Sequence, residues 1–345
     1  MRQLIRLSMF TCLLLAFSCA ALAQKSPSGY HVVKQYKLGG DGGWDYLIYD
    51  AKGNRVFISR STHVMVVDAD TGAVVGDIPD TQGVHGIALA DEFGKGYTSN
   101  GRANTVTVFD VKTLKVLKQI PVGQNPDAII YDPASKRVFT MNGRSNDATA
   151  IDAKTDAVAG TVALEGKPEF ATSDEKGHVF VNLEDKSTIV ELDSQKLTAL
   201  GRWPLAPCEE PSGMAIDRKH HRLFSGCSNK VMAVVDADSG KVITTVPIGQ
   251  GVDANGFDDG ADFAFSSNGG DATLTIVHED SPQKFTVVEN VPTQRGARTM
   301  TLDAKSHRVF LVTAEFGPPP APTPDRPRPR PSIVPGSFTL LVVGK

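Results

Sequence analysis

Short apolar runs alternate with polar turns along the chain from residue 44 onward. The runs hold four to six residues rich in Val, Ile, Phe and Thr, and the turns contain Gly, Asn, Asp or Ser. A typical unit begins with a strand ending in Asp, such as Asp50, followed by the polar turn 51–54 and a strand starting with Arg55. Neither a 3.6-residue period nor helix caps persist after residue 23. The pattern therefore predicts hairpin-connected strands and an all-β protein.

The strongest signal is an internal repeat. Runs ending in Asp recur, with the terminal aspartates 42, 42, 41 and 43 residues apart: Val64–Asp68, Thr105–Asp110, Asp147–Asp152, Thr188–Asp193 and Val231–Asp236. One further step of 42 residues reaches His278. This spacing suits a four-stranded propeller blade. The first strands begin near seven positions: Trp44, His85, Pro126, Pro168, Pro211, Val252 and Ala297. We therefore predict a seven-bladed β-propeller.

The two ends of the chain complement each other. Residues 31–40, HVVKQYKLGG, match the fourth-strand segment 114–123, LKVLKQIPVG. The last unit stops after its third strand, Phe338–Val343. We therefore expect the N-terminal strand to complete the last blade, which closes the ring and leaves no free sheet edge there.

The repeats also carry a family resemblance. Residues 105–142, TVTVFDVKTLKVLKQIPVGQNPDAIIYDPASKRVFTMN, resemble the YVTN β-propeller repeats of YncE-like proteins, and the resemblance extends over nearly the whole chain after residue 23. It implies the propeller fold. Some relatives are secreted or surface proteins, and YncE-like members are associated with single-stranded DNA binding. The resemblance therefore adds DNA binding as an alternative function, although the repeated residues are those that build blades.

The first 23 residues have the features of a signal peptide. Arg2 and Arg6 precede an apolar stretch, and Ala21-Leu22-Ala23 forms an A-x-A cleavage site. A membrane anchor and lipid attachment at Cys19 are the alternatives, but the apolar stretch is short for a membrane span. We expect residues 24–345 to form one exported domain, periplasmic or secreted and monomeric, that does not cross the membrane.

Charge and cysteines refine this prediction. The first 23 residues hold two arginines and no acidic residue, so 34 basic and 39 acidic residues remain, a net charge of −5. This balance disfavours a general polyanion binder, because nucleic-acid affinity depends largely on Lys and Arg. Cys208 and Cys227 remain after cleavage and are expected to form a disulfide, because both flank blade five on loops that open on one face.

The candidate ligand site is a ring of polar residues at the start of the seven first strands. The ring comprises Asp45, His85, Asp127, Glu169, Ser212, Asp253 and Arg298. The blade scaffold does not require polar residues there, so the mouth of the central channel is the predicted site for a small polar molecule. Its acidic balance suits a cation or a donor-rich molecule. A solvated mouth without a ligand is the alternative. We predict no metal, because ligands spread over seven blades are expected to lie too far apart for one ion, and no cofactor.

Three functional classes follow. The first is a binding or scaffold protein with a small-molecule or protein partner. The second is a hydrolase of lactonase type that uses the mouth carboxylates with His85 as acid and base. The third is single-stranded DNA binding, which needs a basic groove with exposed aromatic residues. No nucleophile elbow, H-E-x-x-H, phosphate-binding loop, dinucleotide motif or C-x-x-C-H is present, so no catalytic residue is assigned.

Several loops add weaker signals. Asn100-Gly101-Arg102, Asn142-Gly143-Arg144 and Asn268-Gly269-Gly270 follow second strands, and Arg60 holds the related place in blade one. Asn-Gly is typical of a turn with positive φ, whereas Arg102 and Arg144 of the two Asn-Gly-Arg copies could reach an anion. His220-His221 falls in a turn and is expected to be exposed rather than metal-bound.

A proline-rich segment, GPPPAPTPDRPRPRP, begins at Gly317. It favours polyproline II and is predicted to be a loop of about residues 317–336 inserted in blade seven. One interpretation is an irregular surface loop. The other is a docking arm, or a flap over the mouth, that presents Arg326, Arg328 and Arg330 to an acidic partner.

Overall fold

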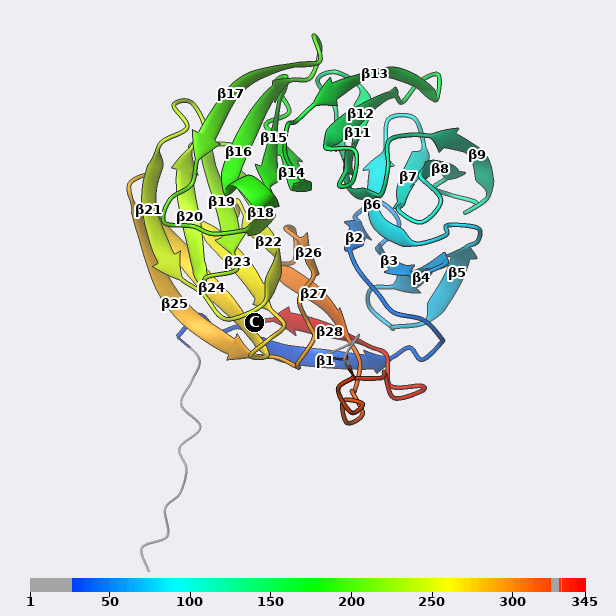
Figure 1. Ribbon diagram of the computed structural model, residues 1–345. Helices are drawn as coiled ribbons and strands as arrows, with labels where there is room; N and C mark the ends of the chain where they lie inside the picture. The colour runs from blue at the N-terminus through cyan, green and yellow to red at the C-terminus, as the bar shows by residue number, and fades with distance from the viewer. Residues whose placement is uncertain (1–26, 324–328, 330) are drawn as a thin grey trace, which may run out of the picture.

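The computed structural model describes residues 27–323, 329 and 331–345. Within them, 28 strands form seven four-stranded antiparallel sheets that surround a common axis (Figure 1). The predicted seven-bladed β-propeller is therefore confirmed. No α-helix occurs in the described residues, which contain one 3₁₀ turn at Glu184–Lys186, and no helix in that part of the chain could cross a membrane. The first 23 residues, predicted as a signal peptide, lie outside the described residues.

Six blades are continuous in sequence, and the first strand of each is innermost. Blade one is β2 (Leu47–Asp50), β3 (Arg55–Arg60), β4 (His63–Asp68) and β5 (Val74–Ile78). Blade two is β6 (Val84–Ala90), β7 (Lys95–Asn100), β8 (Thr105–Asp110) and β9 (Val116–Pro121). Blade three is β10 (Pro126–Asp132), β11 (Arg137–Asn142), β12 (Asp147–Asp152) and β13 (Ala157–Ala163). Blade four is β14 (Pro168–Ser173), β15 (His178–Leu183), β16 (Thr188–Asp193) and β17 (Thr198–Pro204). Blade five is β18 (Pro211–Asp217), β19 (Arg222–Cys227), β20 (Val231–Asp236) and β21 (Val242–Pro247). Blade six is β22 (Val252–Asp258), β23 (Phe263–Asn268), β24 (Thr273–Ser281) and β25 (Lys284–Pro292).

Blade seven joins the two ends of the chain. It consists of β26 (Met300–Asp303), β27 (Arg308–Thr313), β28 (Thr339–Gly344) and, on its outer edge, β1 (His31–Lys37). The antiparallel register runs from His31 opposite Gly344 to Lys37 opposite Thr339. The predicted closure by the N-terminal strand is therefore confirmed, and backbone groups of β28 that would otherwise face solvent are paired.

The repeated side chains hold each blade together. The aspartate that ends a first strand accepts hydrogen bonds from the following turn, as Asp50 Oδ1 does from the amides of Lys52 and Gly53. An asparagine at the end of a second strand reaches the third: Asn100 Nδ2 donates to the hydroxyl groups of Thr105 and Thr107. Second-strand phenylalanines are buried between neighbouring blades, as at Phe57, Phe139, Phe224 and Phe310. This packing of successive sheets forms the core.

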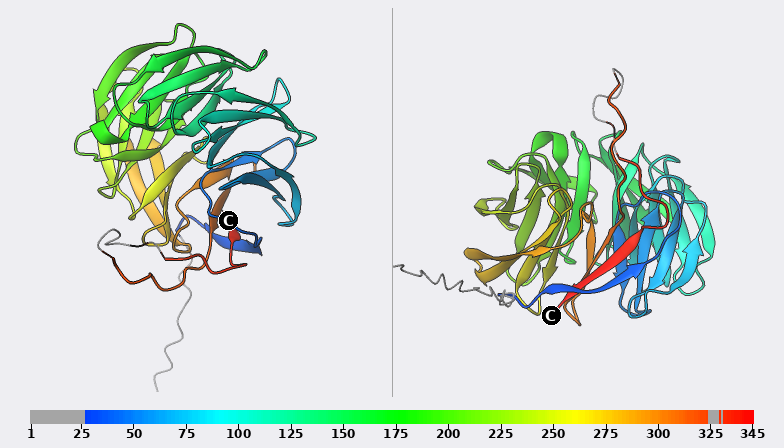
Figure 2. Two further views of the ribbon diagram at one scale, coloured as in Figure 1. Left: turned by 45° about the vertical axis from the view of Figure 1, so that its right-hand side comes forward. Right: turned by 90° about the horizontal axis from the view of Figure 1, so that it is seen from below.

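Two further features lie at the rim. Cys208 and Cys227 form a disulfide with their Cα atoms 5.6 Å apart, which ties the loop entering blade five to the end of β19. The proline-rich segment leaves blade seven after β27, and its base is fastened by a β-bridge between Phe316 and Ile333. Its described parts stand out from one face of the propeller (Figure 2). Arg326, Arg328 and Arg330, proposed as contacts for an acidic partner, lie outside the described residues.

Candidate functional site at the channel mouth

The seven ring residues come from equivalent places in the blades. Five of them are the second residue of an innermost strand, whereas Asp45 and Arg298 lie just before β2 and β26. Six line one cavity of about 850 Å³: Asp45, His85, Asp127, Glu169, Asp253 and Arg298. The base of the proline-rich segment adds Phe316, Pro331 and Ile333 to its wall. The channel mouth is thus a cavity lined by charged ring residues and, on the side of the proline-rich segment, by apolar residues.

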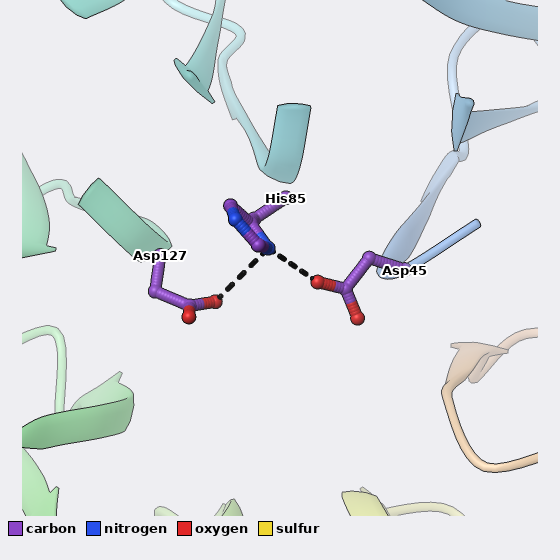
Figure 3. Close-up of side chains that lie close together, drawn as sticks. All are labelled: Asp45, His85 and Asp127. Carbon is purple, nitrogen blue, oxygen red and sulfur yellow. Dashed lines mark hydrogen bonds and ion pairs between the residues drawn. The ribbon is translucent and has the colours of Figure 1, made fainter. Parts of the chain in front are cut away.

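His85 lies between two carboxylates (Figure 3). Its Nδ1 is 2.6 Å from Asp45 Oδ2 and 3.6 Å from Asp127 Oδ1. Burial alone lowers the pKa of the imidazole, but the hydrogen bond with Asp45 and the charge of Asp127 outweigh it and raise the pKa to about 9. His85 is therefore a cation at neutral pH. Its single Nδ1 proton is donated to Asp45 in a hydrogen bond.

Arg298 is the second cation of the ring. Its Nε donates to Asp253 Oδ2 at 2.6 Å, and its Nη2 donates to Asp45 Oδ1 at 3.1 Å. The other oxygen of Asp253 accepts a bond of 3.0 Å from Ser212 Oγ. Burial raises the pKa of Asp253, and the charge of Arg298 opposes this rise. The negative charges of Asp45 and Asp253 are thus balanced by the two cations of the ring, His85 and Arg298.

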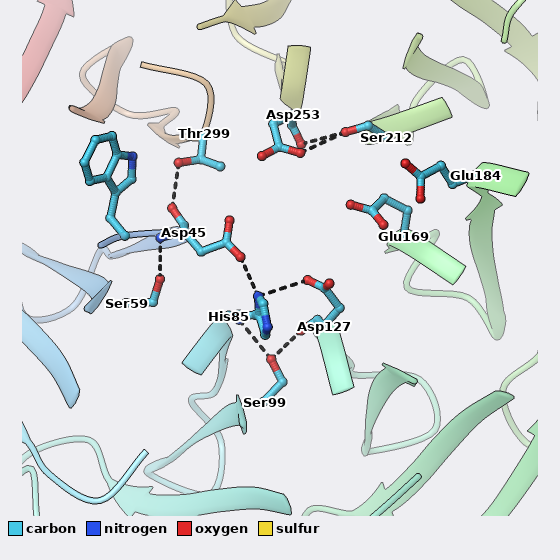
Figure 4. A network of polar contacts seen from close by, with 12 residues as sticks. Asp45, Ser59, His85, Ser99, Asp127, Glu169, Glu184, Ser212, Asp253 and Thr299 are labelled. Carbon is cyan, nitrogen blue, oxygen red and sulfur yellow. Dashed lines mark hydrogen bonds and ion pairs between the residues drawn. The ribbon is translucent and has the colours of Figure 1, made fainter. Parts of the chain in front are cut away.

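Asp127 and Glu169 are less well compensated (Figure 4). Burial raises the pKa of Asp127 to about 7, against the opposing charge of His85. Burial and then the nearby Asp127 raise the pKa of Glu169 to about 8. The nearest cation to Glu169 is Lys167, whose Nζ is 3.3 Å from Oε2 but also contacts Glu184. Glu169 Oε2 is buried and accepts no hydrogen bond from any residue that the structure describes.

Sequence reasoning missed Lys167. It lies two residues before Glu169, outside the ring positions, and its ammonium group reaches back to the carboxylate. The sequence feature that could have identified it is a basic residue directly before the Pro-Glu pair that begins a first strand. The direction of the Lys167 side chain, however, depends on the loop that contains Glu184.

Three neighbouring ring residues come closer together than expected. One ligand atom from each of Asp45, His85 and Asp127 lies within 4.8 Å of the others, which is compatible with a single metal ion. The expectation that ring residues are too far apart for one ion therefore does not hold for these three. A cation here would compete with His85 for its bond to Asp45 and would face Arg298, which also binds Asp45. The protein's own cations already occupy this side of the ring.

The Asn-Gly-Arg loops border a recess beside the ring. Arg102 and Arg144 are exposed and line this space of about 470 Å³ together with His85 and Arg298. The prediction of positive φ at Asn-Gly is wrong, because the left-handed residues are Asn104, Asn146 and Ala272 further along each loop. The recess gives the mouth a basic border on the side of blades two and three.

Arg60, at the related place in blade one, has a structural role. Its side chain is buried, and its guanidinium group lies 3.6 Å from the centre of the Phe338 ring. It donates hydrogen bonds to the backbone carbonyls of Gly39, Gly40, Asp41, Gly42 and Gly43. Burial lowers its pKa to about 10. Arg60 fixes the segment that follows β1 and is not available to a ligand.

Below the ring the channel is lined by apolar and polar side chains together. A second cavity of about 440 Å³ is lined by residues of the innermost strands, including Tyr46, Ile129, Phe170 and Met300. Tyr46 packs against Phe170 with ring centres 5.2 Å apart, and burial raises the pKa of its hydroxyl well above the usual value. The ring charges therefore lie next to a group of aromatic and aliphatic side chains of the innermost part of the blades.

Comparisons with known proteins support the fold. No protein-family model matches the sequence, and no curated protein resembles it. Similar solved structures include Kuenenia stuttgartiensis hydrazine synthase, with a TM-score of 0.71 and 15% identity over 79% of this chain and 94% of that chain. The structure of U3-55K has a TM-score of 0.75 and 7% identity over 90% and 98% of the two chains. A chain of the mitotic checkpoint complex has a TM-score of 0.73 and 13% identity over 99% of both.

These similarities support the propeller fold of the chain. The identities are too low to carry activity or ligand across. The specific resemblance to YVTN repeats of YncE-like proteins finds no support at the family level and stays a hypothesis.

Proposed function

We propose that this protein is an exported binding protein that holds a small, positively charged molecule at the channel mouth. The observation that carries the proposal is the pair of largely buried carboxyl groups, Asp127 and Glu169, that face the cavity and share their nearest cations, His85 and Lys167, with other carboxylates. An ammonium or amidinium group placed between them would supply the missing charge and hydrogen-bond donors.

The charge distribution supports a guest at this side of the mouth. Asp45 takes the hydrogen bond of His85 at 2.6 Å, so Asp127, at 3.6 Å, receives only the field of the imidazolium. Lys167 is shared between Glu169 and Glu184. Two carboxyl groups that share their nearest cations with other carboxylates form a site that favours a cation over a neutral molecule.

The size and lining of the cavity support a small molecule. Its volume of about 850 Å³ lies in the range of about 300–1,000 Å³ typical of ligand pockets. Trp44 and Phe316 lie in its wall with ring centres 6.0 Å apart. The guest would therefore combine a cationic group with an apolar or flat part.

Export is part of this proposal. The N-terminal pattern of the sequence supports it, and so does the Cys208–Cys227 disulfide, because disulfides persist mainly in oxidising compartments.

A hydrolase remains the second candidate because carboxyl groups with pKa values of about 7 and 8 share a cavity with His85. Such groups can exchange protons near neutral pH. Single-stranded DNA binding gains no comparable support. Trp44 is buried against Phe338, and the large exposed apolar side chains among the described residues are Val and Leu, which provide no stacking surface.

Calorimetric titration with matched probes tests the proposal. We expect 1,4-diaminobutane and glucosamine to bind and to raise the Tm, and 1,4-butanediol and glucose not to do so. The Asp127→Asn/Glu169→Gln double variant should lose at least about tenfold in affinity, or about 1.4 kcal/mol. Ser212→Ala, at a ring position outside the cavity, is the control. Equal binding of charged and neutral probes, or unchanged binding by the double variant, would contradict the proposal. Turnover of a simple lactone that the double variant lacks would favour the hydrolase.

A further inference from the structure

A second cluster of metal-ligating side chains lies at the opposite end of the innermost strands. Asp217 ends β18, His220 belongs to the turn that follows it, and Glu279 comes from β24 of the next blade (Figure 1). One ligand atom from each lies within 4.8 Å of the others. Ser212, in the mouth ring, stands at the other end of β18, so this cluster is separate from the channel mouth.

Glu279 is an exception to the blade repeat. Its amide donates to the Asp262 carbonyl at 2.9 Å, the same backbone bond that the equivalent residues of the other blades make to the turn after their first strand. Those equivalent residues are small or apolar: Ala69, Val111, Ala153, Ser194 and Ala237. A carboxylate here, with a side chain only 2% exposed, is not required to build the blade.

The carboxylate of Glu279 points into the cluster without being satisfied there. Neither oxygen accepts a hydrogen bond from the residues that the structure describes. His220 Nδ1 lies 3.0 Å from Glu279 Oε1 and 2.7 Å from Asp217 Oδ2. The single proton on Nδ1 can form a linear hydrogen bond with Asp217 Oδ2 or with Glu279 Oε1, but not with both. Burial and then the charge of Asp217 raise the pKa of Glu279 to about 7, although the charges of His220 and Arg222 oppose this rise.

The nearest arginine does not resolve this imbalance. Arg222 Nη1 donates to Asp236 Oδ2 at 2.8 Å, and its Nε donates to the Pro282 carbonyl at 2.8 Å. Asp259 adds negative charge close by, since burial and then Asp217 raise its pKa against the charge of Arg218. The cluster thus brings together carboxylates whose charges the neighbouring arginines do not balance.

We propose that Asp217, His220 and Glu279 form a binding site for a divalent transition-metal ion such as Zn²⁺. A metal ion between the three side chains would bind the Nδ1 lone pair and one oxygen of each carboxylate at once, which a proton cannot do. One imidazole and two carboxylates suit Zn²⁺ better than Mg²⁺, which prefers an all-oxygen shell. His220 is 26% exposed on its side chain, which leaves an entry route and room for water as a further ligand. The ion would link blades five and six on the face opposite the mouth.

His220, expected to be exposed rather than metal-bound, is only partly exposed, and its ring is directed at two buried carboxylates. In blades three and seven a serine, Ser135 or Ser306, stands at the equivalent place and donates to the aspartate that ends the first strand. His220 can make the hydrogen bond to Asp217 that a serine makes in those two blades. This bond does not explain why the carboxylate of Glu279 lies beside His220.

Zinc binding measured on matched variants tests the site. Purified protein treated with EDTA and then dialysed should bind Zn²⁺ and show a higher Tm with ZnCl₂ than with MgCl₂. Glu279→Ala gives blade six the alanine found in three other blades, and His220→Ser gives blade five the serine found in two others. We expect both variants to fold, to bind one zinc equivalent fewer than the parent and to lose most of the zinc-dependent rise in Tm.

His221→Ser is the matched control, because His221 is the adjacent residue and pairs with Asp238 on the surface. It should keep full zinc binding. The parent failing to bind zinc, Glu279→Ala or His220→Ser binding as many equivalents as the parent, or a loss seen in His221→Ser instead, would each overturn the proposal. Zinc bound at Asp45, His85 and Asp127 would be unchanged in these variants, so the channel mouth is tested separately.

Discussion

The imidazole of His85 packs directly on the backbone of Gly101. A Cβ atom at Gly101 would lie 2.7 Å from His85 Nε2, closer than real Cβ contacts allow. Gly101 is not in the left-handed region, so its lack of a side chain, and not a special φ, is what the site needs. Gly269 has the same relation to Arg298, whose Cβ would be 2.7 Å from an added Cβ. The imidazole of His85 and the backbone and Cβ of Arg298 therefore each pack against a glycine that follows a second strand.

Gly101→Ala should displace His85 from Asp45. We expect a loss of about 1–3 kcal/mol in the free energy of unfolding, the usual effect of overpacking. The pKa of His85 followed by NMR should fall from its value of about 9, because the hydrogen bond that raises it is lengthened. Gly143→Ala is the control: the nearest atom to its added Cβ is Asn125 Nδ2 at 3.4 Å. An equal effect of the two substitutions would show that the contact with His85 is not the cause.

The ring should make stability fall as the pH rises. Asp127 and Glu169 have folded-state pKa values of about 7 and 8, above those of the unfolded chain. The folded state therefore keeps protons that the unfolded state has released, and this contribution is present near pH 4 and lost as the pH passes 7 to 8. His85, raised to about 9, acts in the same direction. We therefore expect the free energy of unfolding to decrease continuously between pH 5 and 9.

Chemical denaturation across that pH range measures the effect. The Asp127→Asn/Glu169→Gln variant should show a clearly shallower dependence, because two of the three groups no longer titrate. A parental slope in the double variant would place the titrating groups elsewhere.

The same carboxyl groups should control binding of a cationic guest. Protonated carboxyl groups offer no charge, so the affinity for 1,4-diaminobutane should rise as the pH increases from 6 to 8.5, while the amine stays protonated. Titration calorimetry at several pH values measures this rise. An affinity that is constant over this range would argue against Asp127 and Glu169 as the contacts.

The number of blades and the positions of the seven ring residues could be predicted from the sequence. Repeated local interactions fix the length of each blade, and therefore the spacing of equivalent residues along the chain. Asp68 Oδ1 accepts bonds from the amides of Asp70 and Thr71, and Asp152 does the same with Lys154 and Thr155. An interaction within three residues leaves a visible pattern in the sequence, and its recurrence sets the period.

The ion pairs that the ring residues form with one another could not be predicted in the same way. The bond between Arg298 and Asp45 joins residues 253 positions apart, and its length depends on how the ring closes. The structural role of Arg60 could not be predicted for a similar reason. Its position matches the second-strand loops of other blades, but in blade one the segment after β1 passes over it and takes all its hydrogen bonds among the described residues.

The disulfide offers a local test. Cys208 and Cys227 are 19 residues apart, so their bond should contribute about 3 kcal/mol by restricting the unfolded chain. Titration of free thiols in the unfolded, unreduced protein should find none in the chain without residues 1–23. Reduction, or the Cys208→Ala/Cys227→Ala variant, should lower the Tm by several degrees without opening the ring. Two titratable thiols would contradict the bond.

Deleting residues 24–40 should destabilise the protein far more than loss of the disulfide. The deletion removes β1 and exposes the edge of β28, whose backbone groups pair with it from Thr339 to Gly344. It also removes two of the five carbonyl groups bound by the buried guanidinium of Arg60, those of Gly39 and Gly40. Combining the deletion with Arg60→Met should recover part of the lost stability, because a buried charge without its acceptors is costly. Denaturant unfolding of the parent, the deletion and the combination measures both steps. A deletion variant that unfolds like the parent would show that β1 is not needed to close the propeller.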